Sequence, residues 1–503
     1  MIEDLARTLM AEARASNERR LLVLAGDAAA TRDAAAAALS AAEIPVGDRT
    51  IVGPSTEIAG DHLPMERAGS LIGTTRTAIV LDCHEGCRPN ALGRTVGAVD
   101  GGGLYVLCTP PLDDWPDCRG PGEEWLAVPP ATIADVTGTF RERMVSLLRQ
   151  HPGIAVVDVD AGYIERDGKT NPAPRITSTG PEPPTDGSFP AAAYRACLTG
   201  DQVDALAAYE PLARPGETLV VEADRGRGKS AAAGLGASSL ALVGKDVLVT
   251  GPQYRSVAEV FRRASKLLED LDALEQVDQA DHPHRLETAA GVVRFEPPAT
   301  ASRLPGDPDV VIVDEAAAFP VRRLAAFLDA PAVAFATTIH GYEGAGRGFS
   351  VRFRDSLEER RETVTECTMT TPIRYGEADP VESWAFRTLL LDARPAVDQL
   401  VAAAEPETVD YEHLTTERLL ADEQQLRQAF GLLVLAHYRT EPDDLARLLD
   451  APNVTARALL YGGRVVSVAL LAREGGLPDE RRQSMYDGAR IRGNMIPDVL
   501  TTQ

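Results

Sequence analysis

A short stretch between an apolar run and an alanine-rich segment constrains this chain most. Ala223-Asp224-Arg225-Gly226-Arg227-Gly228-Lys229-Ser230 follows Leu219-Val220-Val221 and precedes a segment of helical composition. A strand that turns through glycines into a helix directs backbone N–H groups at phosphate oxygens, where lysine adds charge and a serine hydroxyl can ligate Mg²⁺. The pattern predicts a phosphate-binding loop formed by Gly226, Arg227, Gly228, Lys229 and Ser230. Ala223 replaces the usual first glycine, so the motif alone also fits an ordinary strand-to-helix turn.

An acidic pair farther along the chain favours the nucleotide interpretation. The apolar run 310–313 ends in Asp314 and Glu315. In nucleotide-hydrolysing sites such a strand places one carboxylate to hold Mg²⁺ through water and another to polarise the attacking water. We therefore predict ATP–Mg²⁺ binding, with Ser230 and Asp314 at the metal and with Lys229, Asp314 and Glu315 as catalytic residues. The acidic segment alone also fits a buried strand that ends at a solvated turn.

Length and composition limit the remaining possibilities. A chain of 503 residues is too long for one core and predicts roughly three domains. No apolar run approaches the roughly 20 residues that span a bilayer, and the acidic start Met1-Ile2-Glu3-Asp4 lacks the basic region of a signal peptide. We therefore expect a cytoplasmic protein with no membrane partner. The six cysteines have no C-x-x-C spacing, so we expect reduced thiols, with a zinc site as the alternative.

The charge is strongly negative, at −24, and the cations are unusual. Lys169, Lys229, Lys245 and Lys266 are the only lysines among 51 positive residues, which face 75 acidic ones. An acidic, lysine-poor and alanine-rich composition is typical of a halophile, where a carboxylate surface keeps the protein in solution. The net charge does not exclude RNA, but any RNA groove must be a local arginine-rich patch.

The pattern of apolar runs predicts an α/β protein in several parts. In residues 1–166, apolar strands near 21–25, 77–82, 104–109 and 154–159 alternate with helical stretches, which predicts a mostly parallel sheet. Residues 167–190 are rich in Pro, Gly and Thr and read as a linker. Residues 191–400 form a second α/β unit, with strands near 247–249, 310–313 and 333–336. Residues 401–503 read as an acidic helical stretch followed by a hairpin at Gly462-Gly463.

Further segments resemble the tRNA(Met) cytidine acetyltransferases (TmcA), whose eukaryotic relatives acetylate rRNA and tRNA. The resemblance extends through almost the whole chain and is most specific in ordered motifs. These are Gly73-Thr74-Thr75, Val80-Leu81-Asp82, Gly101-Gly102-Gly103-Leu104, Val313-Asp314-Glu315-Ala316-Ala317-Ala318, residues 337–349, Pro372-Ile373-Arg374-Tyr375, His437-Tyr438 and residues 492–498.

The resemblance implies three parts: an N-terminal accessory α/β domain, a RecD-like P-loop helicase module that hydrolyses ATP, and a GNAT-type acetyltransferase domain. It implies transfer of acetyl from acetyl-CoA to N4 of cytidine, giving N4-acetylcytidine. The implied substrate is the wobble cytidine of elongator tRNA-Met, with other tRNA or rRNA sites as alternatives.

The resemblance also carries an expectation about the C-terminal end. Family members continue past residues 494–498 into a strand and a glycine-rich loop that binds the pyrophosphate of acetyl-CoA. No such loop precedes Gln503. We therefore expect a C-terminally truncated member that keeps the ATPase, with an incomplete GNAT domain and an acetyl-CoA motif beyond Gln503.

Individual site residues follow from the same resemblance. Gln202 stands where the family reads the adenine, and Arg347 matches an arginine at the nucleotide phosphates. Arg374 is a second candidate, and a surface ion pair is the alternative for both arginines. His437 is the candidate for proton handling or for orienting the cytosine, and Tyr438 for stacking on a base. The alternative for His437 and Tyr438 is that they finish a packed helix.

Two other function classes remain open from the sequence. One is a RecD-like nucleic-acid-stimulated ATPase or helicase without acetyl transfer, which does not need residues 405–503. The other is an inert RNA- or nucleotide-binding scaffold, which predicts no ATP turnover despite Lys229, Asp314 and Glu315.

Overall fold

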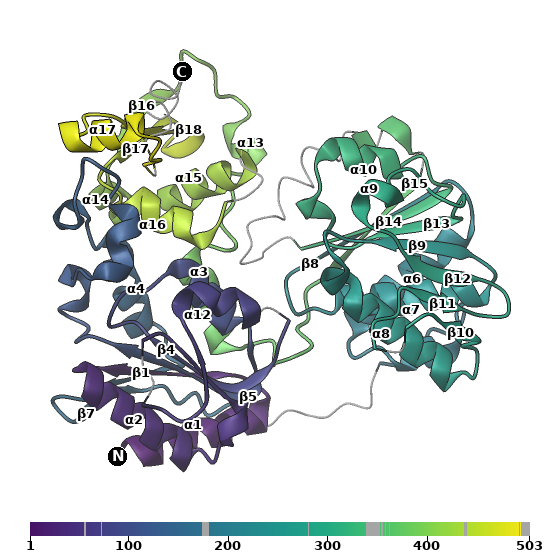
Figure 1. Ribbon diagram of the computed structural model, residues 1–503, viewed down its shortest axis with the longest axis horizontal. Helices are drawn as coiled ribbons and strands as arrows, with labels where there is room; N and C mark the ends of the chain where they lie inside the picture. The colour runs from purple at the N-terminus through teal and green to yellow at the C-terminus, as the bar shows by residue number, and fades with distance from the viewer. Residues whose placement is uncertain are drawn as a thin grey trace. The chain divides into compact units, whose positions relative to one another are not determined.

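The computed structural model describes residues 1–54, 57–71, 73–173, 181–279, 281–338, 353, 356–357, 359–361, 363–436, 440–491 and 493. Contacts divide the chain into two compact units. The first unit comprises residues 1–175, 375–433 and 440–503, and the second comprises residues 176–374 and 434–439. Both units mix helices and sheets (Figure 1), which confirms the α/β class. The domain boundaries expected after residues 166, 190 and 400 stay a prediction.

Within these ranges no helix has both the length and the apolar character needed to cross a bilayer.

The first unit contains a seven-stranded sheet in the order β3-β2-β4-β5-β1-β6-β7. All neighbouring strands are parallel except β7, which runs antiparallel to β6. The strands are β1 (Arg20–Ala25), β2 (Arg49–Val52), β3 (Asp61–Leu63), β4 (Arg76–Asp82), β5 (Val99–Thr109), β6 (Ile154–Asp158) and β7 (Tyr163–Asp167). Each of the four strands expected from apolar runs is present. The glycine motif Gly101 to Gly103 lies inside β5, at a shift in its register with β4.

Helices cover both faces of this sheet (Figure 1). On one face, α1 (Ile2–Ser16) and α2 (Ala28–Ala41) bury alanine and leucine side chains against β1, β4, β5 and β6. The other face is contacted by α3 (Pro89–Val96), α4 (Thr139–Gln150) and α12 (Pro380–Leu389). α12 therefore helps to cover one face of a sheet whose strands all lie more than 200 residues earlier in the chain.

The C-terminal part of the first unit is a three-stranded antiparallel sheet with helices. The glycine turn predicted from sequence is confirmed, because Gly462 (φ 54°) and Gly463 (φ 78°) join two paired strands. The strands are β16 (Asp410–Leu414), β17 (Val454–Tyr461) and β18 (Arg464–Ala472). The helices are α13 (Asp398–Val401), α14 (Thr416–Ala421), α15 (Glu423–Ala436), α16 (Pro442–Asp450) and α17 (Asp479–Tyr486).

The second unit is built on an eight-stranded sheet in the order β10-β11-β12-β9-β13-β14-β8-β15. The six strands from β12 to β15 in this order are parallel, while β10, β11 and β12 pair antiparallel. The strands are β8 (Glu217–Ala223), β9 (Asp246–Thr250), β10 (Gln276–Val277), β11 (Arg285–Glu287), β12 (Val292–Phe295), β13 (Val310–Val313), β14 (Ala332–Thr338) and β15 (Thr363–Met369).

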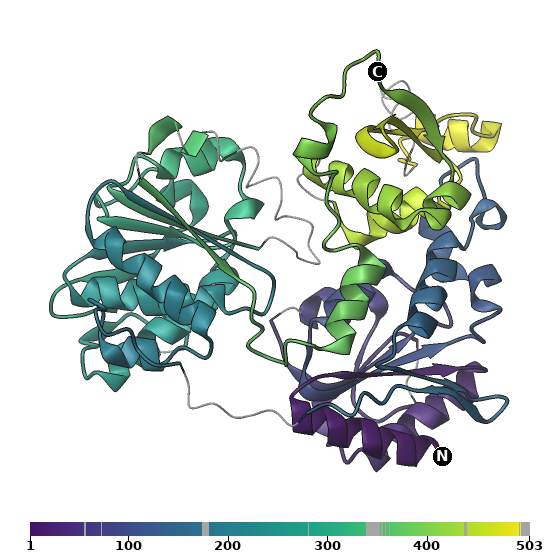
Figure 2. The same ribbon diagram turned by 180° about the vertical axis from the view of Figure 1, so that it is seen from behind.

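Alternate side chains of these strands build two cores. On one face, α5 (Ala191–Arg195), α6 (Gly200–Tyr209), α7 (Lys229–Leu242) and α8 (Tyr254–Asp270) pack on residues such as Val221, Val249 and Ile312. On the other, α9 (Pro298–Ala301) and α10 (Val321–Phe327) pack on Val220 and Val313 (Figure 1, and from behind in Figure 2). Because parallel strands end at the same edge, the last residues of β8, β13 and β14 lie there.

Short 3₁₀ helices connect several elements, at Val46–Asp48, Met65–Leu71, Trp115–Asp117, Pro121–Leu126, Ile133–Asp135, Glu210–Ala213 and Ala316–Ala318.

Candidate nucleotide-binding site

The predicted phosphate loop joins β8 to α7. β8 ends at Ala223 and α7 begins at Lys229. Between them Gly226 (φ 77°) and Gly228 (φ 89°) have left-handed backbones, which glycine adopts without the steric cost of a Cβ. Among the described residues, no side chain caps the first turn of α7, and uncapped N–H groups at a helix N-terminus can bind an anion. This is the local geometry on which the sequence prediction rests.

The alanine in place of the first motif glycine has a structural explanation. Ala223 is the last residue of β8 and is paired with Thr338 on one side and Met369 on the other. It is fully buried and is not among the residues with a left-handed backbone. Because an extended residue between two strands needs no glycine, the substitution leaves the turn at Gly226 and Gly228 intact.

The acidic pair follows β13 at the same edge of the sheet. Asp314 is completely buried, whereas the Glu315 side chain is about one third exposed, at 35 %. Glu315 has a left-handed backbone (φ 51°, ψ 46°), which is rare for a residue with a long side chain. Such strained conformations persist where the surroundings enforce them and cluster at functional sites.

Lys229 meets both carboxylates. Its Nζ lies 2.5 Å from Glu315 Oε1 and 3.9 Å from Asp314 Oδ1. Burial alone would lower the pKa of Lys229, but the two carboxylates outweigh it and raise the pKa. Burial would likewise raise the pKa of Glu315, but Lys229 reverses the shift and lowers it. The loop lysine and Glu315 therefore form a charged pair.

Asp314 differs from its neighbour. Burial raises its pKa, against the opposing effect of Lys229. The nearby Ser230 hydroxyl also opposes the rise in the Asp314 pKa, and the Glu315 N–H donates to Asp314 Oδ1 at 2.9 Å. Oδ2 is buried and has no hydrogen-bond partner among the described residues. A buried carboxylate oxygen left free beside a serine hydroxyl suits a Mg²⁺ ion with its water shell.

One residue of the site was not predicted. Thr338 ends β14, the strand between β8 and β13, and its Oγ1 donates to Glu315 Oε2 at 3.1 Å. With Lys229 on the other oxygen, Glu315 is held from both sides. The sequence held a signal for Thr338, because neighbouring parallel strands end at the same edge of a sheet and the apolar run of β14 ends at Thr337-Thr338.

The remaining predicted residues fall into two groups. Gln202 lies against the loop, where its Nε2 donates to the Gly228 carbonyl at 3.2 Å. Arg227 is buried, and its guanidinium lies 4.0 Å from Asp224. Arg374 directly follows Ile373, whose N–H donates to the Gly226 carbonyl at 3.0 Å. Arg347, His437 and Tyr438 lie outside the described residues, so their roles stay predictions.

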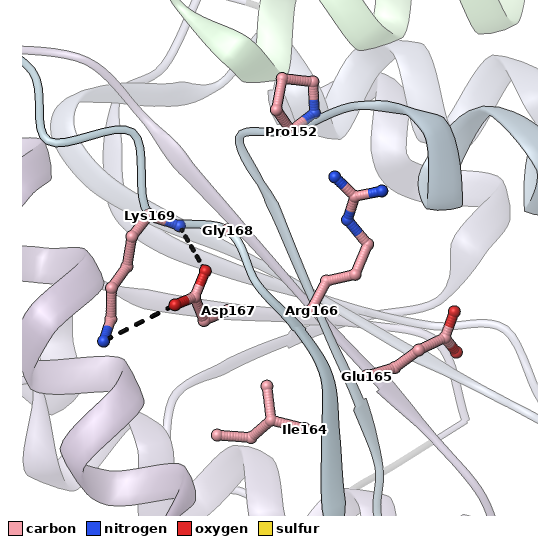
Figure 3. A pocket seen from close by; sticks show the side chains of 7 residues that line it. All are labelled: Pro152, Ile164, Glu165, Arg166, Asp167, Gly168 and Lys169. Carbon is pink, nitrogen blue, oxygen red and sulfur yellow. Dashed lines mark hydrogen bonds and ion pairs between the residues drawn. The ribbon is translucent and has the colours of Figure 1, made fainter.

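A separate hollow lies in the first unit, beside β7, with a volume of 560 Å³ (Figure 3). Its lining includes Glu165, Arg166, Asp167 and Lys169. Three of these charged side chains are in ion pairs, because Lys169 Nζ lies 3.8 Å from Asp167 and Glu165 accepts from Arg149 at 2.8 Å. The hollow contains none of the predicted site residues.

All six cysteines are free thiols. Over the part of the chain that the structure describes, no three His, Cys, Asp or Glu side chains cluster in a way that would hold a metal ion.

Comparison with known proteins identifies relatives of the whole chain. A family model described as "tRNA(Met) cytidine acetyltransferase TmcA, N-terminal" matches residues 1–159. A second, described as "RNA cytidine acetyltransferase NAT10/TcmA, helicase domain", matches residues 220–392. Among solved structures, the large terminase of a thermophilic bacteriophage aligns over 54 % of this chain and 68 % of that one, at 11 % identity. Its TM-score of 0.29 is too low to bear on the fold.

Three curated relatives share the name "tRNA(Met) cytidine acetyltransferase TmcA". The Haloarcula marismortui protein is 62 % identical over 501 residues, which are 99 % of this chain and 65 % of the relative. The Haloferax volcanii protein is 58 % identical over 100 % of this chain and 67 % of the relative. The Nitrosococcus halophilus protein is 39 % identical over 99 % and 65 %. The chain therefore spans about two thirds of the length of these relatives.

Proposed function

The chain belongs to the tRNA(Met) cytidine acetyltransferase family, and from that premise we propose that it serves ATP-dependent acetylation of RNA. The reaction transfers acetyl from acetyl-CoA to N4 of cytidine, in the first place the wobble cytidine of elongator tRNA-Met, with other tRNA or rRNA sites as alternatives. The proposed division of labour assigns ATP hydrolysis to a RecD-like module in the second unit. It assigns the front of a GNAT-type acetyltransferase to residues 401–503.

The single observation that supports the ATPase most strongly is the Lys229 contact with the acidic pair. Lys229 begins the helix after the loop, and its ammonium lies between Glu315 at 2.5 Å and Asp314 at 3.9 Å. When ATP binds, the Lys229 ammonium would exchange its contact with Glu315 for contacts with γ-phosphate oxygens, and the Glu315 carboxylate would lose this partner. Glu315, still held by Thr338, is then free to accept a proton from the attacking water.

Magnesium would be held by Ser230 and by Asp314, whose buried Oδ2 has no partner within the described ranges. The ion would neutralise charge on the β- and γ-phosphates. The loop N–H groups and the first turn of α7 would bind the remaining phosphate oxygens.

In the acetyl-transfer step, N4 of cytidine would form a bond to the acetyl carbonyl carbon as the thioester C–S bond breaks. Coenzyme A would leave as the thiolate, which takes up a proton, while N4 loses one proton. The exocyclic amine is a poor nucleophile because its lone pair is delocalised into the ring, so a group that takes this proton accelerates the step. His437 is the proposed group because imidazole titrates near neutral pH. Tyr438 is proposed to stack on a base.

The proposal is tested first on ATP turnover. Replacing Lys229 by Ala removes the ammonium that contacts the acidic pair, and we expect phosphate release to fall about 100-fold or more. The control is Lys266→Ala, because Lys266 is exposed on α8 and pairs with Asp270 in the next turn. Wild-type turnover by Lys229→Ala would contradict the assignment of the loop.

Acetyl transfer needs its own measurement. A form of the protein that includes the acetyl-CoA motif expected beyond Gln503 is incubated with elongator tRNA-Met, ATP and labelled acetyl-CoA in molar KCl, and the RNA is digested to nucleosides. The proposal predicts ATP-dependent label in N4-acetylcytidine. RNA-stimulated ATP turnover without labelled nucleoside would instead favour a helicase-like motor.

A further inference from the structure

A buried glutamine holds the main chain of the phosphate loop. Gln202 lies in the first turn of α6 and is 1 % exposed. Its Oε1 accepts the Leu198 N–H at 2.7 Å, and its Nε2 donates to the Gly228 carbonyl at 3.2 Å. Both ends of the amide are therefore bound to backbone.

The contact with Gly228 is unusually close. A Cβ on Gly228 would lie 2.2 Å from Gln202 Nε2 and 3.4 Å from Ile373 Cδ1. The same Gly228 carbonyl accepts the Ala232 N–H at 3.0 Å, the first hydrogen bond of α7. Gln202 thus bonds to the peptide that both closes the loop and begins the helix, immediately before Lys229.

A second backbone contact holds Gly226, the other left-handed glycine of the loop, and it too depends on the first turn of α6. The Ile373 N–H donates to the Gly226 carbonyl at 3.0 Å. Residues just before Ile373 are bound to Asp201, whose carboxylate accepts the N–H groups of Thr370 at 2.6 Å and Thr371 at 2.8 Å. Asp201 and Gln202 are neighbours, so one helical turn supports both left-handed glycines.

We infer that Gln202 is a positioning residue that sets the phosphate loop, and with it Lys229, independently of the nucleotide base. The inference rests on the proposed ATP site and specifies how that site is kept in shape. A glycine-rich loop without such contacts samples many conformations, and ordering it on binding costs affinity. Hydrogen bonds to a buried amide remove that cost in advance because the loop is already in its binding conformation.

The role is distinct from the one that family resemblance suggests for this position. A residue that reads adenine affects only ligands that carry the base. A residue that positions the loop affects every ligand that the loop binds, including inorganic tripolyphosphate, which has no base. The two roles can therefore be separated with one variant and two ligands.

The test uses Gln202→Leu, which keeps the volume but loses the amide, and Gln424→Leu, an exposed glutamine on α15, as its matched control. Displacement of fluorescent mant-ADP measures the affinity of ATP and of tripolyphosphate. We expect Gln202→Leu to weaken both about ten-fold or more and by the same factor, since a misplaced loop costs affinity whatever the ligand. Gln424→Leu should match the wild type. Loss of ATP affinity alone would overturn the inference, as would wild-type affinity for both ligands.

Hydrogen exchange provides a readout that requires no activity. Without nucleotide, a peptide covering residues 224–231 should exchange faster in Gln202→Leu than in the wild type, while the core strand β13 is unchanged. Equal exchange in the two proteins would overturn the inference. If wild-type protein fails to bind mant-ADP, the proposed function fails, but the exchange experiment still decides whether Gln202 holds the loop.

A second variant covers the case in which Gln202→Leu does not fold. Asp201→Asn keeps the side-chain shape but weakens the bonds to Thr370 and Thr371, and it should weaken ATP and tripolyphosphate equally, by a smaller factor. A selective effect on ATP in this variant would also count against the inference.

Discussion

At the scale of single residues, the sites of this protein depend on side chains that each serve two neighbours. Glu315 contacts Lys229 and Thr338, and its left-handed backbone aims it at the loop. His84, at the corresponding edge of the first unit, is similar. Its Nδ1 lies 2.7 Å from Asp82 Oδ1 and its Nε2 lies 3.1 Å from the Gly26 carbonyl. Two acceptors on one ring favour the imidazolium, which donates from both nitrogens.

The stability of the first unit should therefore depend on pH through His84. Burial would lower its pKa, but hydrogen bonds to Asp82 and Gly26 outweigh burial and the nearby Arg32 charge, so the pKa is raised above 6.5. Because the pKa of His84 is higher in the folded than in the unfolded protein, its protonation stabilises the fold. This contribution to the free energy of unfolding is complete below about pH 6.5 and is lost as pH rises through the raised pKa. We expect His84→Gln to cost about 1 to 2 kcal/mol at pH 6 and less at pH 9.

The measurement is the difference in melting temperature between wild type and variant at the two pH values, at constant salt. Exposed His62 provides the control, since His62→Gln should change little at either pH. A His84→Gln deficit that is the same at pH 6 and pH 9 would show that the ring is not held as the cation.

At this scale, the role of a residue can be predicted from the sequence only where it depends on neighbours along the chain. Lys229, Ser230, Asp314 and Glu315 were identifiable because a motif places them within a few residues of a strand end. The hydrogen bond from the Gln202 side-chain amide to the Gly228 carbonyl was not identifiable. It joins residues 26 positions apart and depends on how α6 packs on the loop. Family resemblance suggested a nucleotide contact for Gln202 and carried no information on which atoms its amide contacts.

At the scale of elements, the prediction succeeded for buried strands and failed for elements without an apolar run. β1, β4, β9, β13 and β14 read as continuous apolar segments because both faces of a parallel sheet are covered. β15 reads Thr-Val-Thr-Glu-Cys-Thr-Met and lies at the sheet edge, partly exposed, so it has no such signature. The placement of α12 on the first sheet was also not predictable, because it depends on contacts with α3, α4 and β1, far earlier in the chain, and on a long-range ion pair.

That ion pair anchors α12. Asp379 accepts from Arg19 Nη2 at 2.9 Å and from the Glu382 N–H at 2.7 Å. The same carboxylate therefore pairs with Arg19 and caps the N-terminus of α12. Neither side chain is more than 1 % exposed. The Arg19 guanidinium also lies 3.7 Å from the centre of the Tyr375 ring.

Replacing Arg19 by Leu should destabilise the first unit by about 3 to 5 kcal/mol, because it leaves a buried carboxylate without its cation. The double variant Arg19→Leu/Asp379→Asn should recover part of this loss, since Asn removes the charge and still caps α12. Urea unfolding measures both. Arg262→Leu, in an exposed pair with Glu259, should cost less than about 1 kcal/mol. Equal stability of Arg19→Leu and wild type would show that the pair does not hold α12.

At the scale of the whole molecule, charge dominates. The chain has a net charge of −24, and like-charge repulsion opposes any compact state. The relatives from Haloarcula marismortui and Haloferax volcanii, at 62 % and 58 % identity, fit the halophilic composition inferred from sequence.

Folding and ATP turnover should accordingly require high salt. At 1 M the Debye length shrinks to about 3 Å, so repulsion among surface carboxylates is screened, whereas at 0.01 M it is about 30 Å. We expect the circular-dichroism melting temperature to rise by at least about 10 °C between dilute buffer and molar KCl. An unchanged melt would contradict a halophilic surface, and sucrose at equal osmolality controls for solute effects other than charge.

The division of the chain has a consequence for synthesis on the ribosome. Residues 1–175 and residues 375–433 belong to one unit, and most of the second unit, residues 176–374, is encoded between them. At roughly 5 to 20 residues per second, the ribosome needs about 10 to 40 s to translate the intervening stretch. During that interval Arg19 has no Asp379 and one face of the first sheet lacks α12. The nascent chain therefore exposes an incomplete first unit, residues 1–175, while the second unit is synthesised, and the first unit is completed only after Asp379 and α12 have left the exit tunnel.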